Sequence, residues 1–274
     1  SSSYIDLAFA SLNVNNNFTW SFWIKFNSFT LYDTPIGFFM NGYTNFIDLV
    51  DVNGQLSFYD GNSRLNTPSS TFATGSWYHV AVTKSSTNGR KFYVNGSEVA
   101  SNSSTSNSGS SAGGRNLLGA YSSSGNPTTA LLNVDGDMAQ VRIFHSALTA
   151  SQISDLYTEP AASNNTLNYP AGAGCIAAYP LQTDAVDLSG SYSGASSNVT
   201  FGQPGYLTSN TDGTITSTVA ANTEAGFSIV QWKGIASAAT VGHGLGKIPE
   251  LIIAKNIDTA NSWAVYSEPT TINY

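Results

Sequence analysis

The stretch FTWSFWIKF, residues Phe18–Phe26, alternates large apolar side chains with smaller or polar ones. In an extended chain, one side would carry Phe18, Trp20, Phe22, Ile24 and Phe26. The other side would carry Thr19, Ser21, Trp23 and Lys25. This period of two predicts a β-strand with one buried side. Trp23 is the exception on the polar side, so it predicts either a buried contact between sheets or a subunit interface.

The same alternation recurs along the first 145 residues. The further runs are FIDLVD, QLSFYD, WYHVAVTK, RKFYVNG, EVAS and DMAQVRIF. Asn-Gly and Asp-Gly pairs separate them, at 53–54, 60–61, 88–89, 95–96 and 135–136. These pairs favour the positive φ angles of tight hairpin turns. Many short strands with regular turns predict an all-β fold, an antiparallel β-sandwich or jelly roll, with a second, smaller β domain after it.

One helix is expected, at LTASQISDLY, where Thr149 or Ser151 can cap an apolar stripe of Ile153, Leu156 and Tyr157. The polar segments 101–115 and 121–130 predict long loops, which in a sandwich tend to lie at its ends and carry binding residues.

The composition excludes several classes of function. Charged residues make up 10% of the 274 residues, against about 25% in an average protein. Ten Lys and Arg face 17 Asp and Glu, a net charge of −7, which argues against nucleic acid because phosphates need a basic face. The single Cys175 excludes an intramolecular disulfide framework. No apolar run reaches 18 residues, so we expect no membrane insertion.

Four segments in order resemble the laminin-G-like, concanavalin-A-type jelly roll over residues 4–157: FTWSFWIKF, GSWYHVAVTK, KFYVNGSEV and GDMAQVRIFHSALTASQISDLY. That family more often has Asp-Glu-Val before its last strand. Ala139, Gln140 and Val141 stand here instead, so no metal or charge role is carried over from that position.

The segment 176–202 is similar to the opening of the same family, which normally precedes a run such as SSSYIDL. Here it follows a linker rich in Pro, Gly and Asn. Either the module is circularly permuted and this segment completes the first sandwich, or a truncated second copy begins here. The expected domains are a jelly roll at 1–158, a linker at 159–174, the opening segment at 175–205 and a small, incomplete β module at 206–274.

The tail at 224–266, EAGFSIVQWKGIASAATVGHGLGKIPELIIAKNIDTANSWAVY, resembles a β module at the ends of virion proteins of tailed bacteriophages. With a lectin-like jelly roll, the resemblance implies a tail fibre or a capsid fibre or decoration protein on the particle surface. It also implies assembly with other virion proteins and a homo-oligomer, a trimer. The chain starts at Ser1 rather than Met, so we expect a piece of a longer protein.

A sugar site needs an exposed ring for the apolar face of a pyranose and polar partners for its hydroxyls. The candidates in or beside predicted loops are Tyr59, Asp60, Asn62, Arg64, Arg115 and Tyr121. For each residue alone, a core ring or a solvated polar group is the simpler interpretation. Together they would bind a glycan of the host cell surface.

Calcium is the one cofactor considered. Asp135 and Asp137 could offer it oxygen ligands, although an Asp-Gly turn and solvent explain them more simply. Asp48 and Asp51 have the same two explanations.

Catalytic patterns are missing from the sequence. The five Glu residues are scattered and none has the Glu-x-Asp-x-Glu spacing of glycoside hydrolases, which need two carboxyl groups across the scissile bond. His79, His145 and His243 form no zinc motif, and Gly242–Gly246 (GHGLG) predicts a glycine turn rather than a nucleotide loop. We therefore expect no enzyme.

The alternatives to a glycan-binding virion protein are a structural decoration protein without ligand, a secreted bacterial adhesin module and a glycan-degrading enzyme.

Overall fold

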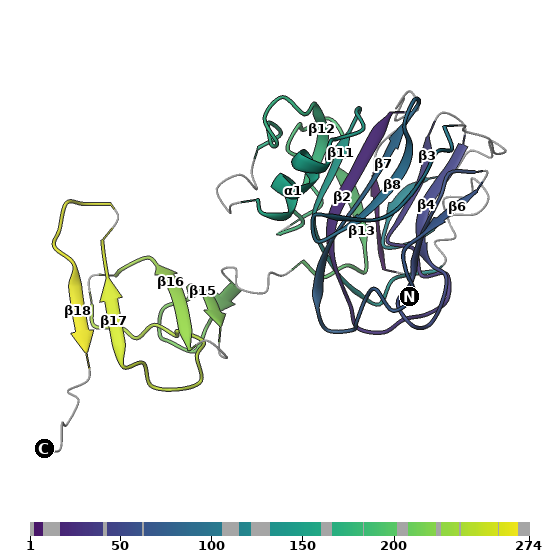
Figure 1. The fold of residues 1–274 in the computed structure, drawn as a ribbon. Helices are drawn as coiled ribbons and strands as arrows, with labels where there is room; N and C mark the ends of the chain where they lie inside the picture. Colours follow the sequence, from purple (N-terminus) through teal and green to yellow (C-terminus); the bar gives the residue numbers. More distant parts are fainter. Residues whose placement is uncertain are drawn as a thin grey trace, which may run out of the picture. The chain divides into compact units, whose positions relative to one another are not determined.

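The computed structural model describes residues 3–7, 17–40, 43–61, 63–105, 115–121, 132–159, 166–182, 184–201, 208–222, 226–235, 237–256 and 258–267. The chain forms two compact units, Ser1–Phe201 and Gly202–Tyr274 (Figure 1). Each unit is described by itself below.

The first unit is a sandwich of two antiparallel sheets, which confirms the predicted fold class (Figure 1). In spatial order, the seven-stranded sheet contains β13 (Gly194–Ser197), β1 (Tyr4–Leu7), β10 (Asn116–Leu118), β3 (Ile36–Met40), β4 (Tyr43–Leu49), β5 (Leu56–Tyr59) and β6 (Arg64–Asn66). The six-stranded sheet contains β12 (Cys175–Tyr179), β11 (Gly136–Phe144), β2 (Phe18–Phe26), β7 (Trp77–Ser85), β8 (Gly89–Val94) and β9 (Ser97–Asn102). Because β9 includes Ser101 and Asn102, the predicted loop begins two residues later than expected.

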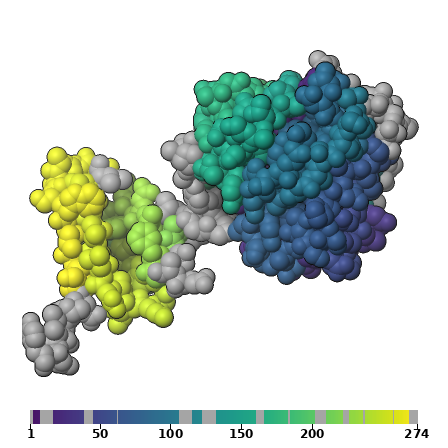
Figure 2. Space-filling view, in the orientation of Figure 1, coloured from purple at the N-terminus to yellow at the C-terminus, as the bar shows by residue number. Residues whose placement is uncertain are grey.

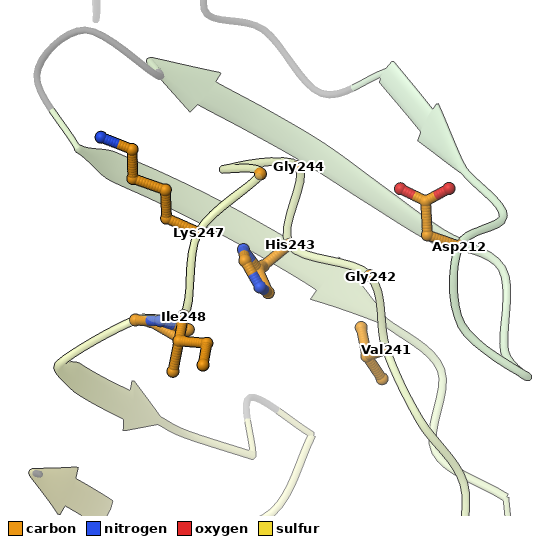
Figure 3. A pocket seen from close by; sticks show the side chains of 9 residues that line it. Asp212, Val241, Gly242, His243, Gly244, Lys247 and Ile248 are labelled. Carbon is orange, nitrogen blue, oxygen red and sulfur yellow. The ribbon is translucent and has the colours of Figure 1, made fainter.

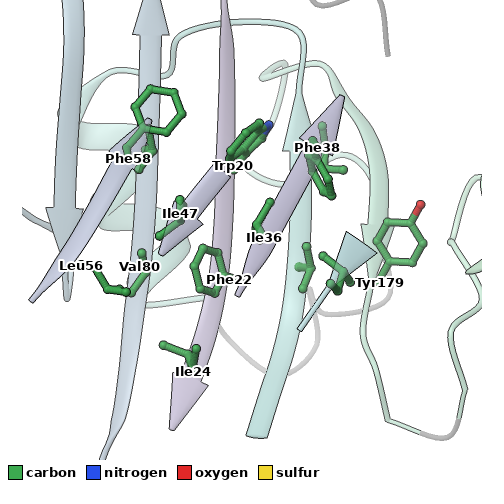
Figure 4. Close-up of a cluster of buried hydrophobic side chains, with 14 of the residues drawn as sticks. Trp20, Phe22, Ile24, Ile36, Phe38, Ile47, Leu56, Phe58, Val80 and Tyr179 are labelled. Carbon is green, nitrogen blue, oxygen red and sulfur yellow. The ribbon is translucent and has the colours of Figure 1, made fainter. Parts of the chain in front are cut away.

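The core lies between the two sheets, and β2 supplies its centre (Figure 4). All five predicted inward side chains of β2 are buried, as expected, but Thr19 and Ser21 on the other side are buried as well, so the expectation of a single buried side is wrong for that half of the strand. The Trp20 ring lies edge-on to Phe38 of the other sheet, with 4.9 Å between ring centroids, and to Phe58 at 5.7 Å. Rings from one sheet therefore interdigitate with rings from the other, as expected for aligned sheets.

The segment after the predicted linker belongs to the first sandwich. β12 pairs with β11, with Tyr179 opposite Val141, and β13 pairs with β1, with Ser197 opposite Tyr4. The segment thus adds one edge strand to each sheet, the first of the two arrangements considered from the sequence.

The segment expected to be a linker lies inside the first unit. The Arg142 guanidinium donates to the Glu159 carboxylate at 2.5 Å and to the Thr166 carbonyl at 2.7 Å. Ala173 is buried beside the helix in a second apolar cluster. The segment is therefore held against the sandwich at Glu159, Thr166 and Ala173.

Two predicted turns illustrate different uses of glycine. Asn95 and Gly96 both have positive φ, 49° and 77°, which confirms the tight turn between β8 and β9. The turn predicted at Asp135-Gly136 is wrong, because Gly136 is the first residue of β11. A Cβ atom there would lie 2.2 Å from the Lys25 carbonyl oxygen. Gly136 is needed for close approach of β11 to β2.

The helix α1 (Ala150–Tyr157) begins after Thr149, whose side chain accepts a hydrogen bond from the Gln152 amide in a capping box. Tyr157 stacks on Trp23, with 5.8 Å between ring centroids. The helix therefore explains the tryptophan on the polar side of β2 as a contact within the chain. No helix among the described residues is long and apolar enough to cross a bilayer.

The second unit has two small sheets. One contains β14 (Thr208–Asn210), β15 (Ser217–Asn222) and β16 (Phe227–Trp232), and the other contains β17 (Leu251–Ala254) and β18 (Ala264–Ser267). The connection Gly242–Gly246 lies against β15, where the Ser217 hydroxyl donates to the Gly242 carbonyl at 3.0 Å. Gly244 and Gly246 have φ of +70° and +67°, which confirms the predicted glycine turn.

Candidate binding face on the seven-stranded sheet

Strand pairing places one row of residues across the outer face of the seven-stranded sheet. The row runs from Ala195 through Asp6, Leu117, Gly37, Phe46 and Tyr59 to Arg64, each opposite the next on the neighbouring strand. Their neighbours Phe38, Ile47, Phe58 and Leu65 point into the core. Because side chains alternate along a strand, the row faces away from the core.

Three rings and a guanidinium gather at one end of this row. The ring centroid of Phe46 is 5.0 Å from that of Tyr59 and 5.2 Å from that of Tyr121. The Arg64 guanidinium carbon lies 5.4 Å from the Phe46 centroid and 5.5 Å from that of Tyr59. We call Phe46, Tyr59, Arg64 and Tyr121 the Arg64 cluster. Its rings are half-buried and Arg64 is exposed, so a ligand can reach it.

A buried carboxylate fixes the guanidinium over the rings. Asp48 accepts two bonds from Arg64, at 2.5 and 3.0 Å. Burial raises the pKa of Asp48, while the hydrogen bonds and charge of Arg64 oppose this shift. Two parallel bonds hold the guanidinium plane in one orientation, which a single-point cation would not achieve.

Tyr121 adds a hydroxyl donor to the cluster. Burial, and then the neighbouring Tyr59, raises the pKa of Tyr121 above its ordinary value. Its hydroxyl is therefore protonated at neutral pH. Gly37 makes room for this ring, because a Cβ atom there would lie 3.4 Å from Tyr121 Cδ2 and 3.0 Å from the Ala120 carbonyl oxygen.

A second arginine, Arg115, lies just before β10 and bonds to Asp6, the residue of the row that stands opposite the buried Leu117. Arg115 donates to the Asp6 carboxylate from Nε at 2.8 Å and also from a terminal nitrogen. Its guanidinium carbon lies 5.1 Å from the centroid of the Tyr4 ring. Five strand spacings separate Asp6 from Arg64, about 24 Å. Of the predicted sugar-binding residues, Tyr59, Arg64, Arg115 and Tyr121 are thus brought to one face.

Asp60 was predicted as a sugar-binding residue in or beside a loop, and it does lie in the connection between β5 and β6, but it does not reach the surface. Its side chain is fully buried, with Oδ2 3.1 Å from Lys84 Nζ and 3.0 Å from an Arg90 terminal nitrogen. The Ser63 amide donates to its other oxygen at 3.1 Å. Lys84 and Arg90 belong to the other sheet, so this triad ties the two sheets together. The remaining candidate, Asn62, lies outside the described residues.

The four aspartates considered for calcium have protein partners, Asp48 with Arg64 as described above and Asp51 with the amides of Asn53 and Gln55. Asp135 accepts bonds from Asn27 Nδ2 at 3.2 Å and from the Ser28 hydroxyl at 2.7 Å. Asp137 pairs with Lys25 at 2.6 Å. Within the described part of the chain, no three His, Cys, Asp or Glu side chains converge as metal ligands would. A calcium role for Asp135 and Asp137 stays a prediction.

One buried serine–histidine pair has the distance of a nucleophile and its base. Ser21 Oγ lies 2.8 Å from His79 Nε2. His79 is buried, and burial lowers its pKa to about 4, so the ring is neutral at pH 7. Trp23 and Tyr157 lie against it, with centroids 5.5 and 6.1 Å away. Its Nδ1 atom has no hydrogen-bond partner among the described residues, so the orienting acid of a triad is missing. The pair is part of the packing beneath α1.

Comparison with known families places the first unit. Residues 1–154 match the family described as the concanavalin A-like lectin/glucanases superfamily. The chain belongs to the concanavalin A-like lectin/glucanase superfamily. Residues 188–273 match a family described only as a domain of unknown function, so the resemblance to phage virion modules stays a prediction. No curated protein sequence matches the chain significantly.

Solved structures share the fold of this lectin-like chain. A candidate carbohydrate-binding protein from Bacteroides ovatus aligns with a TM-score of 0.56 and 23% identity, over 73% of this chain and 57% of that protein. The chain therefore spans little more than half of that relative's length. A pentraxin from Limulus polyphemus aligns with a TM-score of 0.40 and 20% identity, over 57% and 76% of the two chains. At 23% identity, the alignment with the Bacteroides ovatus protein establishes a common fold only.

Proposed function

We propose that the outer face of the seven-stranded sheet binds carbohydrate through the Arg64 cluster, with Arg115 extending the site. The observation that carries this proposal is the clustering of three partly exposed rings around an arginine that Asp48 already holds in place. Aromatic faces pack on the apolar faces of sugar rings, while fixed polar groups select hydroxyls. A guanidinium has five N–H donors, so Arg64 keeps three for a ligand after bonding Asp48.

The charges favour a neutral sugar over an acidic one. Arg64 is paired with Asp48, and Arg115 with Asp6, so each cation on the face is matched by a carboxylate. The chain as a whole carries a net charge of −7. A polyanionic glycan would meet a repulsive field at this protein. We therefore propose neutral hexose units as the ligand class.

Binding without hydrolysis is the proposed activity. Glycoside hydrolysis requires two carboxyl groups flanking one bond, one of them free to donate a proton. The carboxylates of this face, Asp6 and Asp48, are each committed to an arginine. Such ion pairs hold each carboxylate in one orientation, which suits recognition.

We propose that the chain is a bacteriophage virion protein, a tail fibre or a capsid fibre or decoration, that presents this face to a host surface glycan. The similarity of residues 224–266 to tailed-phage virion modules supports this assignment. The second candidate is a secreted bacterial adhesin module, favoured by the fold shared with the Bacteroides ovatus protein. Antibody labelling of intact phage particles separates them, because only a virion protein would be labelled.

The binding proposal is tested by calorimetric titration of the full chain with ligands selected from a glycan array. We expect Tyr59→Ala to weaken binding at least tenfold, since stacking on the ring is lost. The matched control is Tyr32→Ala, an exposed tyrosine in the connection between β2 and β3. Equal affinities for Tyr59→Ala and the unaltered chain would rule out this face, and an array without any bound glycan would favour a structural decoration protein.

A further inference from the structure

The second unit has almost no interior of its own. Of its described residues, only Ser217 and Val219 are buried. Large apolar side chains with 44–85% of their area exposed are Phe227, Ile229, Trp232, Ile235, Ile248, Leu251, Ile252, Ile253, Trp263, Val265 and Tyr266. A domain of about 60 residues normally buries about 60% of the surface of its unfolded chain. The described residues of this unit therefore leave most of its large apolar side chains without a cover from the unit itself.

The hairpin β17–β18 is apolar on both faces. Ile252 lies opposite Tyr266 on one face, and Ile253 lies opposite Val265 on the other. All four side chains are exposed. Strands with apolar residues on both sides are typical of sheets covered on both sides. A two-stranded hairpin alone is marginally stable in water, so burial on both faces would stabilise it.

The three-stranded sheet also has an uncovered face. The Ser228 hydroxyl donates to the His243 carbonyl at 2.6 Å, so this side of β16 faces the Gly242–Gly246 connection. Phe227 and Ile229 point to the opposite side and are exposed. Two residues after this connection, Ile248 helps to line an open groove of about 650 Å³ together with Val241 and His243 (Figure 3). Figure 2 shows a hollow between the green and yellow parts of this unit.

The exposed apolar area is large enough for a stable interface. Eleven side chains, each exposing on the order of 100 Å², amount to roughly 1,000 Å² in total, spread over both faces of β17–β18, the outer side of β16 and the connections. A standard stable interface buries about 800 Å² per partner. Interfaces this rich in apolar side chains are typical of permanent complexes rather than of transient encounters.

We propose that Gly202–Tyr274 is a self-assembly module, in which the apolar faces of β17–β18 pack against the same unit of a second copy of the chain. The net charge of this unit favours a second copy of the chain over a strongly charged partner. The unit contains five acidic residues and three lysines: Asp212, Glu224, Glu250, Asp258 and Glu268, with Lys233, Lys247 and Lys255, a net charge of −2. A nearly neutral surface neither attracts a strongly charged partner nor repels its own copy.

The unpaired sheet edges of this unit, and the symmetry of common assemblies, also favour a second copy of the chain as its partner. In their sheets, β17 and β18 each pair on one side only, as do β14 and β16. Such edges can accept a strand from a neighbouring copy. Homo-oligomers with closed symmetry are the commonest soluble assemblies, and identical copies all carry the same uncovered hairpin. The interior missing from one chain would thus form between copies.

The test is sedimentation equilibrium of the full chain between about 1 and 100 µM, a range that covers μM affinities. We expect a dimer or larger oligomer, and Val265→Asp should raise its dissociation constant at least 100-fold, because burying an unpaired charge is strongly unfavourable. The matched control is Val52→Asp in the first unit, where valine is 64% exposed against 65% for Val265. We expect this control to assemble normally.

Thermal unfolding of the first unit checks that Val265→Asp has not unfolded the whole protein. An unaltered chain that stays monomeric at 100 µM would overturn the proposal, as would equal dissociation constants for the two variants. Tyr59→Ala should leave the oligomer intact, so failure of the glycan-binding proposal and failure of this one are distinguished.

Discussion

The two units make opposite use of their aromatic side chains. Trp20 in the first unit is completely buried between two sheets, whereas Trp263 in the second is 65% exposed. Both units are rich in small polar residues and short strands, so composition alone does not separate them. The two units differ in what covers the apolar faces of their strands. The first unit covers its strands with a second sheet and a helix, and the second unit has strands whose cover we assign to another copy.

The largest expected effect comes from removing Trp20, the buried ring of the first unit, compared with removing Trp263, an exposed ring of the second. Trp20→Ala should lower the unfolding free energy of the first unit by about 3–5 kcal/mol, because a large cavity is left in a packed core. Trp263→Ala should change the unfolding free energy of the first unit by less than about 0.5 kcal/mol. Urea unfolding followed by far-ultraviolet circular dichroism measures both values. Similar losses from the two substitutions would remove the contrast between the units.

The buried triad is the second way to test the contrast. Asp60→Ala leaves Lys84 and Arg90 without their shared carboxylate in the interior, which should cost about 3–5 kcal/mol. Asp258→Ala, in the second unit, provides the control and should cost less than about 0.5 kcal/mol. The same denaturation assay applies. A tolerated Asp60→Ala would mean that the triad does not hold the two sheets together.

Asp33 should make the stability of the first unit depend on pH. This carboxyl is buried, its Oδ2 atom has no hydrogen-bond partner among the described residues, and burial followed by the charge of Asp135 raises its pKa to about 6. Because the folded state holds the proton more tightly than the unfolded chain, stability should fall as pH rises from about 4 through 6.

Asp33→Asn should therefore stabilise the protein at pH 8 by at most about 3 kcal/mol. The gain should shrink as the pH falls and vanish below about pH 3, where the carboxyl is protonated in both the folded and the unfolded state. Denaturant midpoints across this pH range give the comparison. A gain that is constant with pH would show that Asp33 does not titrate as described.

The smallest expected effect is the loss of glycan affinity caused by a substitution in the Arg64 cluster. Arg64→Lys keeps the charge but loses the two parallel bonds to Asp48 and the stacking on Phe46. Glycan affinity should fall about tenfold, or about 1.4 kcal/mol, with little change in unfolding free energy. The control is Lys91→Ala, which breaks the more exposed pair with Glu98 and should leave affinity unchanged. Full affinity in Arg64→Lys would exclude a positioning role for Asp48.

Local patterns in the sequence predicted most strands of the first unit, but not the short strands β1, β3, β6 and β10, and not the contacts between strands. The alternation of β2 identified every inward residue, because each pattern lies within one strand. Trp23 and Asp60 could not be placed in this way. Trp23 is covered by Tyr157, and Asp60 by Lys84 and Arg90, through contacts that depend on how distant segments pack.

The binding face illustrates the same limit. Arg115 and Asp6 are 109 residues apart, and only the pairing of β1 with β10 brings them together. Phe46 was not among the predicted site residues, since within its own strand it differs little from a core ring. Its outward direction follows from the register between β4 and β5, which no local pattern specifies.

Assembly would connect the two proposals, because linked copies raise the effective concentration of a weak sugar site. The central claim remains the position of the ligand. A crystal structure of the assembled chain with a bound neutral oligosaccharide tests it most directly. We predict a sugar ring against Phe46, Tyr59 and Tyr121, with hydroxyls bonded to Arg64. A sugar bound only at another surface, with this face empty, would contradict the account.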